Sequence, residues 1–251
     1  MRPIHPSLGI VAALIVSVAA CGKDAQTEDA VLTKTSAGEA STSMSGDSAD
    51  NRGQALVRVV NAVPGMNGLI VRSDDSHALP SVDFEKVSDY TPIDKNWVTF
   101  EVGVQPSGTY APVETNREML TDGHRYTMLV MHDKDGAGYQ SRIVRDDIST
   151  DQSKAHLRVI HAAPSMDEIT VVAKGGDELF NGINFKSEAG FKDVEPWSGT
   201  LEFRTEEGKR LLGTMPNVKL SAGVSYTVVL ASNKQGKLAS FWFQDQQVAG
   251  Q

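Results

Sequence analysis

The residues that could do chemistry are few in this chain of 251 residues. It has one cysteine, Cys21, and beyond it five scattered histidines: His77, His124, His132, His156 and His161. No two of these histidines have the spacing of metal ligands on one strand or helix. The chain also lacks a nucleophile elbow, a His-Glu-x-x-His helix, a phosphate-binding glycine loop and paired cysteines. The sequence therefore predicts no catalytic residues, no metal site and no cofactor, and a protein that is not an enzyme.

Cys21 lies in a specific context. The 13 residues from Leu8 to Ala20 are almost wholly apolar. That run is too short to span a bilayer, which takes about 20 helical residues, but it fits a secretory signal peptide. Val18-Ala19-Ala20-Cys21 resembles a bacterial lipobox, whose cysteine thiol accepts a diacylglyceryl group. We predict a signal peptide over residues 1–20 and a membrane anchor at Cys21, with acyl chains such as palmitate. The alternative is an ordinary signal peptide with a chance cysteine.

The residues after Cys21 indicate the membrane to which the protein is sorted and a flexible linker between the anchor and the folded part. Gly22 stands where an Asp would be the usual retention signal for the inner membrane, so it favours the outer membrane; Asp24 nearby weakens this. Whether the protein would face the periplasm or the cell surface stays open. Residues 22–54 contain no aromatic residue and are dominated by Ser, Thr, Gly, Ala and Asp. Such a stretch cannot bury enough apolar surface to order itself, so residues 21–54 are predicted to be a lipidated, disordered linker.

The overall composition is that of a globular protein. Hydrophobic residues make up 40% and charged residues 22% of the chain, and the net charge is −8. Nucleic-acid binding requires clustered Lys and Arg to neutralise phosphates. An acidic chain of this kind therefore indicates no nucleic-acid partner.

The rest of the chain consists of two copies of one repeat unit. Residues 55–66 and 155–166 share six of twelve identities at an offset of 100. The pattern Leu-x-x-Gly-x-x-Tyr-Thr recurs from Leu120 and from Leu220. This indicates an internal duplication. We predict one domain over residues 55–147 and a second over 155–246, joined by a short polar linker.

Each unit has the pattern of β-structure. Val57-Arg58-Val59 and Leu157-Arg158-Val159 alternate apolar with charged residues, which is typical of half-buried strands. Runs rich in β-branched and aromatic residues follow Tyr126 and Tyr226. Short strands separated by turn signals, without a helical pattern, predict an all-β fold of two tandem antiparallel immunoglobulin-like β-sandwiches.

The two opening motifs, Val-Arg-Val-Val-Asn-Ala-Val-Pro and Leu-Arg-Val-Ile-His-Ala-Ala-Pro, resemble the bacterial domain-of-unknown-function 4397 (DUF4397) family. The later Leu-x-x-Gly-x-x-Tyr-Thr motif is similar to its closing half. The resemblance covers most of residues 55–245. It implies an exported, often lipid-anchored envelope protein with tandem immunoglobulin-like sandwiches and no assigned activity. The family pattern favours His where the first unit has Asn61, and the second unit keeps His161.

Several polar residues are interpreted as structural. Asn61 and His161 could each cap backbone groups of the turn that follows. Tyr126 and Tyr226 resemble the tyrosine corner of Greek-key sandwiches, in which the hydroxyl bonds to an earlier backbone carbonyl. Asp133-x-Asp135-Gly136 is favoured as a hairpin turn over a calcium loop, because later ligands are lacking. The acid pairs at 74–75 and 146–147 are interpreted as solvated loops.

Aromatic residues supply the candidate contact site. Alternation along the last strand puts Phe243 inward, as Ile143 is in the first unit, and Trp242 outward with Arg142 at the corresponding position. An outward Trp often marks a contact, so Trp242 and Arg142 are possible partner contacts, although the other domain could equally cover them. Trp97 and Trp197 begin strands in both units and are expected to share a packing role.

These observations favour a lipid-anchored cell-envelope protein that acts as a non-enzymatic binding or adhesion module. Its partners would be the membrane, through the lipid, and an unknown envelope protein or surface polysaccharide. The alternative is a periplasmic structural or assembly spacer, and an uncharacterised enzyme is the least favoured interpretation.

Overall fold

A computed structural model of the chain describes residues 53–74, 78–104, 109–148, 151–205 and 210–245. The predicted signal peptide, Cys21 and nearly all of the predicted linker lie outside these ranges. The described residues form strands, turns and loops, and none of them belongs to a helix that could cross a membrane.

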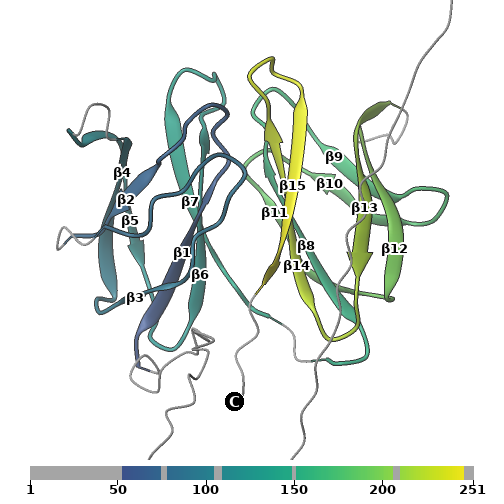
Figure 1. The fold of residues 1–251 in the computed structure, drawn as a ribbon, viewed down its shortest axis with the longest axis horizontal. Coiled ribbons are helices and arrows are strands. Elements are labelled where there is room, and N and C mark those ends of the chain that lie inside the picture. The colour runs from purple at the N-terminus through teal and green to yellow at the C-terminus, as the bar shows by residue number, and fades with distance from the viewer. Residues whose placement is uncertain (1–52, 75–77, 105–108, 149–150, 206–209, 246–251) are drawn as a thin grey trace, which may run out of the picture. The chain divides into compact units, whose positions relative to one another are not determined.

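The first repeat folds into two facing sheets (Figure 1). One sheet has the strand order β3-β1-β6-β7, and the other has the order β2-β4-β5. Their bounds are β1 Ala55–Asn61, β2 Ile70–Arg72, β3 Thr91–Ile93, β4 Trp97–Val104, β5 Ala111–Met119, β6 Arg125–His132 and β7 Tyr139–Arg145.

The second repeat has the same architecture with one more strand. Its sheets have the orders β11-β8-β14-β15 and β10-β9-β12-β13. The bounds are β8 Ala155–Ala162, β9 Ile169–Ala173, β10 Glu178–Ile183, β11 Glu188–Val194, β12 Trp197–Thr205, β13 Leu211–Leu220, β14 Ser225–Ser232 and β15 Leu238–Asp245. The predicted all-β fold of two sandwiches is confirmed.

Each sandwich contains one parallel strand pair among antiparallel ones. β1 pairs in parallel with β6, and β8 pairs in parallel with β14. These are the strands that begin with the duplicated opening motif and with the Tyr-Thr motif. The two most repeated segments of the sequence therefore lie side by side at the centre of each inner sheet.

Alternating side chains of β1 enter two different cores. Val57 and Val59 pack into the core of the first sandwich, between its two sheets. Arg58 and Val60 lie on the opposite face of the same strand and are buried as well. The interpretation of this strand as half-buried was therefore wrong, because a second layer of protein covers its polar face.

That second layer is the other sandwich. The inner sheets containing β1 and β8 face each other (Figure 1). Between them lies a buried apolar cluster, called here the inter-sandwich cluster, to which both repeats contribute. Its fully or almost fully buried members are Val60, Ala62, Leu129, Met131, Val144, Ile160, Ala162, Val229 and Ala231. Side chains from both repeats thus join the two sandwiches, in addition to the linker.

Candidate functional site

Trp242 does not have the orientation predicted for it. Its side chain packs against the core of the second sandwich, and its ring centroid lies 5.3 Å from that of Tyr226. The neighbouring Phe241 and Phe243 face the inter-sandwich cluster instead. The faces were assigned at an offset of 100, but the repeats align at an offset of 99 in this strand, where Ile143 pairs with Met128 and Trp242 with Val228. Trp242 therefore corresponds to Ile143, which packs against the core of its own sandwich, and not to Arg142. A partner contact through Trp242 stays an untested prediction.

Arg142, the other predicted contact residue, reaches across to the second sandwich. Its guanidinium donates a hydrogen bond to the backbone carbonyl of Lys186. The contact seen for Arg142 is therefore the other domain, which was one of the two alternatives for this position.

Trp97 and Trp197 begin β4 and β12, as predicted, but they do not share a packing role. Trp197 packs against the core of its sandwich, whereas Trp97 is 56% exposed. The difference follows from strand alternation. In β12, Trp197 is four residues before the buried Leu201, so both side chains are on the core face of the strand. In β4, Trp97 is three residues before the buried Phe100, so its side chain is on the opposite, outward face. The second repeat has one more residue between its Trp and the matched threonine, Thr200, than the first repeat has before Thr99. The two indoles therefore point to opposite faces of their strands.

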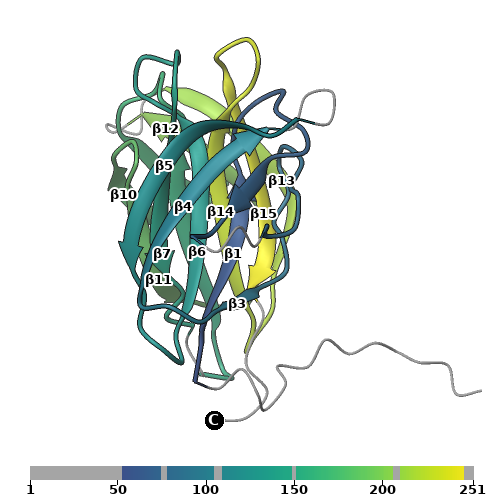
Figure 2. The same cartoon turned by 90° about the vertical axis from the view of Figure 1, so that its left-hand side faces the viewer.

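The outward side of β4 and β5 gathers polar side chains around two exposed apolar ones. We call it the Trp97 face, and Figure 2 shows these two strands in front. Met119, 60% exposed, lies directly opposite Trp97 across the strand pair. The Arg117 guanidinium lies over the Trp97 ring, 5.3 Å from its centroid. The face consists of Trp97, Thr99, Glu101, Thr115, Arg117 and Met119.

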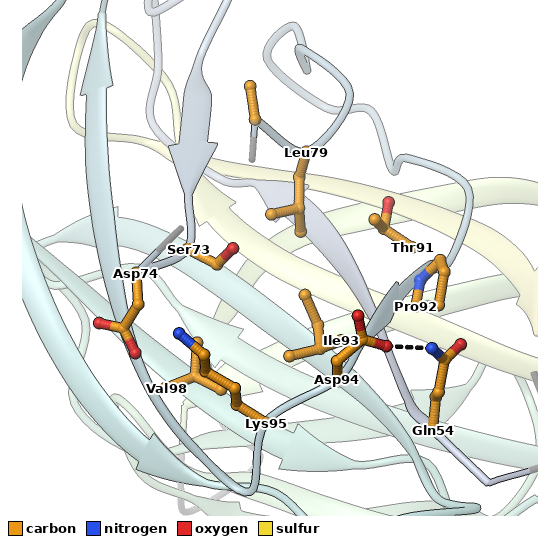
Figure 3. Close-up of a pocket in the computed structure, with 11 residues that line it drawn as sticks. Gln54, Ser73, Asp74, Leu79, Thr91, Pro92, Ile93, Asp94, Lys95 and Val98 are labelled. Carbon is orange, nitrogen blue, oxygen red and sulfur yellow. Dashed lines mark hydrogen bonds between the residues drawn. The ribbon is translucent and has the colours of Figure 1, made fainter. Parts of the chain in front are cut away.

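A pocket of about 330 Å³ opens beside this face, at one end of the first sandwich (Figure 3). Leu79, Ile93 and Val98 form its apolar part, and all three are buried. Its polar lining includes Ser73, Asp74, Asp94 and Lys95, and the Gln54 amide donates a hydrogen bond to Asp94. An apolar floor with a few polar groups at the rim is the usual composition of a small-molecule site.

Asp74 connects the pocket to the Trp97 face. Its carboxylate accepts hydrogen bonds from the backbone and the side chain of Thr99, and these bonds lower the pKa of Asp74. Lys95 and Arg117 add a smaller effect in the same direction. Asp74 is therefore an ionised acceptor at neutral pH, located where the pocket and the face meet.

The most deeply buried charges lie between the sandwiches. Arg58 pairs with Asp245 of the second repeat, and Arg158 pairs with Asp146 of the first at 2.7 Å. The two arginines also lie 3.6 and 3.5 Å from the aspartate of their own repeat. We call these four residues the Arg–Asp network. The interpretation of Asp146 as part of a solvated loop was wrong, because its carboxylate is fully buried in this network.

Hydroxyl groups complete the network with the same geometry in both repeats. Thr127 donates to Asp146 at 2.7 Å, and Thr227 donates to Asp245 at 2.8 Å. Each threonine also accepts a hydrogen bond from the arginine of its own repeat. The buried carboxylates are thus satisfied on several sides, as a buried charge requires. The role of these ion pairs and hydrogen bonds is structural.

The pKa values in the network follow from its geometry. Burial alone would raise the pKa of Asp146, but Arg158 and Arg58 outweigh it, so the pKa lies below its ordinary value. Tyr90 donates its hydroxyl to Asp146 at 2.7 Å. Burial, and then the charge of Asp146, raise the pKa of Tyr90 above its ordinary range. The carboxylate therefore stays charged and the phenol stays neutral.

Asn61 and His161 cap turns as predicted. The Asn61 side chain donates to the carbonyls of Met66 and Val82 and accepts from the amide of Val63. His161 Nδ1 lies 3.2 Å from the donating amide of Ala163, and Nε2 lies 2.8 Å from the Asp167 carbonyl. The Asn61 amide and the His161 imidazole thus cap backbone groups of the equivalent turn in the two repeats.

The Tyr corners are present with a different partner. The hydroxyls of Tyr126 and Tyr226 accept hydrogen bonds from the backbone amides of Thr121 and Ser221, at 2.9 and 3.1 Å. The prediction of a carbonyl partner was wrong, because the preceding chain turns so that a backbone N–H points at each phenolic oxygen.

Asp133 closes the hairpin between β6 and β7. It accepts from the amides of Ala137 and Gly138. Among the described residues, no group of three or more His, Cys, Asp or Glu side chains is arranged to hold a metal ion.

His156 forms the arrangement most similar to catalytic machinery within the described ranges. Its Nδ1 lies 2.6 Å from Asp193, and Ser225 is its register partner on the neighbouring strand. However, Nε2 is engaged by the carbonyl of Asp151 at 2.8 Å, and the Ser225 hydroxyl makes no hydrogen bond. Because His156 and Ser225 are fully buried, this group ties the start of the second repeat to its sheet and offers a substrate no access.

The fold defines a class of protein: two β-sandwiches of one duplicated sequence, joined through buried inner sheets. The chain belongs to the family described as domain of unknown function DUF4397, whose model matches residues 55–172 and again residues 155–251. The double match confirms both the resemblance and the tandem repeat.

Two solved structures show weak similarity. The C-terminal domain of AlgF from P. aeruginosa is 20% identical, with a TM-score of 0.30, and the match covers 37% of this chain and 99% of that one. A candidate cell adhesion protein from Bacteroides fragilis is 9% identical, with a TM-score of 0.20, covering 78% and 99%. Similarities this weak imply nothing about the activity of this chain. No curated protein matched it.

Proposed function

We propose that the protein is a lipid-anchored component of the bacterial cell envelope that binds a partner through the Trp97 face and has no enzymatic activity. The anchor is Cys21, and the lipobox-like sequence before it supports this assignment. Gly22 supports the outer membrane as the destination.

The observation that carries the binding role is the exposure of Trp97. A tryptophan has a large apolar surface that is costly to leave in water, and Trp, Tyr and Arg are enriched among the residues that contribute most to binding at protein interfaces. Here Trp97 is 56% exposed and stacked against Arg117, with Met119 opposite. In the second repeat the corresponding strand turns its Trp inward, so the exposed indole is a feature of the first repeat and not of the fold.

A spacer role is the second candidate, and the inter-sandwich cluster favours it. Two sandwiches joined by buried apolar side chains and the Arg–Asp network resist bending at the linker. A rigid body of this kind could hold other envelope components at a fixed separation without binding through the Trp97 face.

The anchor is tested by replacing its only possible acceptor. Cells that express the full chain with a C-terminal tag are labelled with radioactive palmitate, and their membranes are separated. We expect label in the wild type and none in Cys21→Ser, which leaves the membrane fraction. A Cys21→Ser protein that stays membrane-bound contradicts the lipid anchor.

The binding role is tested in the same cells with a photoreactive amino acid. Benzoylphenylalanine placed at Thr115, an exposed residue of the Trp97 face, should form an adduct of higher mass on illumination. The matched control carries it at Leu211, which is 50% exposed on the second sandwich. Equal adducts from both positions, or none from Thr115, would favour the spacer role.

A further inference from the structure

The exposed apolar surface of the Trp97 face is small. It consists of one cross-strand pair, Trp97 and Met119, between polar neighbours. Stable protein–protein interfaces bury about 800 Å² on each partner, around a continuous apolar centre. One indole and one thioether fall well short of that, even with Val113, which is 37% exposed further along β5. A ligand with a small apolar patch flanked by many hydroxyl groups matches the face better.

A sugar ring has these properties. The face of an aromatic ring carries negative charge density, which attracts the weakly positive C–H groups on one side of a pyranose. The hydroxyl groups around the ring need donors and acceptors in the plane of the stack. The Arg117 guanidinium lies over the Trp97 ring and supplies several planar donors there, so a sugar ring would pack against the part of the indole that Arg117 leaves exposed. Asp74 supplies an ionised acceptor.

We infer that the Trp97 face binds a polysaccharide, with one sugar ring on the indole of Trp97 and neighbouring hydroxyls bonded to Arg117 and Asp74. This inference rests on the proposed function, because it names the chemical class of the partner that the face binds. A chain of sugars, and not a single one, follows from the open sheet surface, which continues past Trp97 to Thr115 and Glu101.

The pocket extends the same site. Asp74 lines the pocket and is bonded to Thr99 of the face, so the pocket adjoins the part of the face where Asp74 would bind a sugar hydroxyl. The buried Leu79, Ile93 and Val98 inside would accept a small apolar substituent, such as an acetyl or methyl group (Figure 3). Its volume of about 330 Å³ is at the small end of the range for ligand sites.

The test uses the full-length protein in detergent micelles. It is run in native gels containing dextran, hydroxyethyl cellulose or polygalacturonate, which sample neutral α-linked, neutral β-linked and acidic chains. We expect at least one of these polysaccharides to retard the wild type. Trp97→Ala should weaken the apparent affinity more than tenfold, and Trp97→Phe should keep most of it. Leu211→Ala is the matched surface control and should behave as the wild type does.

Two outcomes overturn the inference. One is the absence of retardation by all three polysaccharides, and the other is equal retardation of the wild type and Trp97→Ala. Because Trp97 and Leu211 are largely exposed, unchanged melting temperatures will show that neither variant unfolds. If the Thr115 adduct forms in cells but no gel retards the protein, the saccharide inference fails while the proposed binding role stands. If both fail, the binding role fails too.

Discussion

Arg58 of the first sandwich and Asp245 of the second form a buried ion pair between residues 187 positions apart. Arg158 and Asp146 form the reciprocal pair at 2.7 Å. The duplication therefore produced two domains that satisfy each other's buried charges. Either sandwich alone would expose an apolar sheet face and an arginine without its closest partner.

Breaking this pair should be costly. Asp245→Ala leaves Arg58 buried without its nearest carboxylate, and breaking buried pairs typically costs about 3–5 kcal/mol of the unfolding free energy. The matched control is Asp147→Ala, which removes an exposed pair with Arg145 and should cost less than about 1 kcal/mol. Urea unfolding of the full chain measures both. Equal effects would mean that the network contributes no more than a surface pair.

The two tryptophans at the strand starts should differ in stability effect. Trp197→Ala removes a partly buried indole that packs against the core of the second sandwich, so we expect a loss of about 2 kcal/mol. Trp97→Ala removes a mostly exposed indole and should change the unfolding free energy by less than about 1 kcal/mol. A comparison of urea midpoints decides this. A large loss for Trp97→Ala would contradict the assignment of that residue to a binding surface.

His161 should make stability depend on pH. Burial lowers its pKa, and hydrogen bonds to the backbone at Asp167 and Met166 offset this only in part. Below the unfolded pKa of about 6.5 the unfolded chain then binds more protons than the folded one, so stability falls as the pH drops from 7 to 5. His161→Asn places the residue of the first repeat at this turn and should reduce that loss. Melting temperatures at pH 7 and pH 5 test it, and identical pH dependence in the variant would contradict it.

Asp146 should control stability at lower pH. Burial raises its pKa, but the charges of Arg158 and Arg58 and the hydrogen bonds from Tyr90 and Thr127 together lower it further, so the pKa lies below its ordinary value. A lowered carboxyl pKa contributes stability that is present above the unfolded value of about 3.9 and is lost as the pH falls through the folded value. We expect the urea midpoint to drop below about pH 4, and to drop less in Asp146→Asn, which should already be weaker at pH 7. A variant that keeps the full acid-dependent loss would show that other groups cause it.

The sequence was sufficient to predict the repeats, the β-sandwich fold and the turn-capping roles of Asn61 and His161. These features depend on local alternation and on the comparison of one repeat with the other. The burial of Arg58 and Asp146 could not be predicted in the same way. Alternation shows which side chains share a face of a strand, but not whether water or another sheet lies beyond that face.

Two strand faces were predicted wrongly because the repeats do not keep a single offset. In the last strand the offset is 99, so Trp242 corresponds to the inward Ile143. At the start of β4, Trp97 was expected to pack but is 56% exposed. A signal for the exposed Trp97 did exist. Trp97 and Trp197 are 100 residues apart, whereas the matched Thr99 and Thr200 are 101 residues apart. The second repeat therefore has one extra residue between its tryptophan and its threonine. A single insertion in a strand exchanges its two faces.

The proposed function requires that the Trp97 face contact a partner in the envelope. The most direct measurement is the yield of the photo-adduct from position 115 in cells. It is made in three chains: one otherwise wild type, one that also carries Trp97→Ala and one that also carries Leu211→Ala. We expect the adduct yield to fall at least tenfold with Trp97→Ala and to be unchanged with Leu211→Ala. An adduct of equal yield in all three chains would show that the partner does not contact Trp97 and would contradict the proposed binding role.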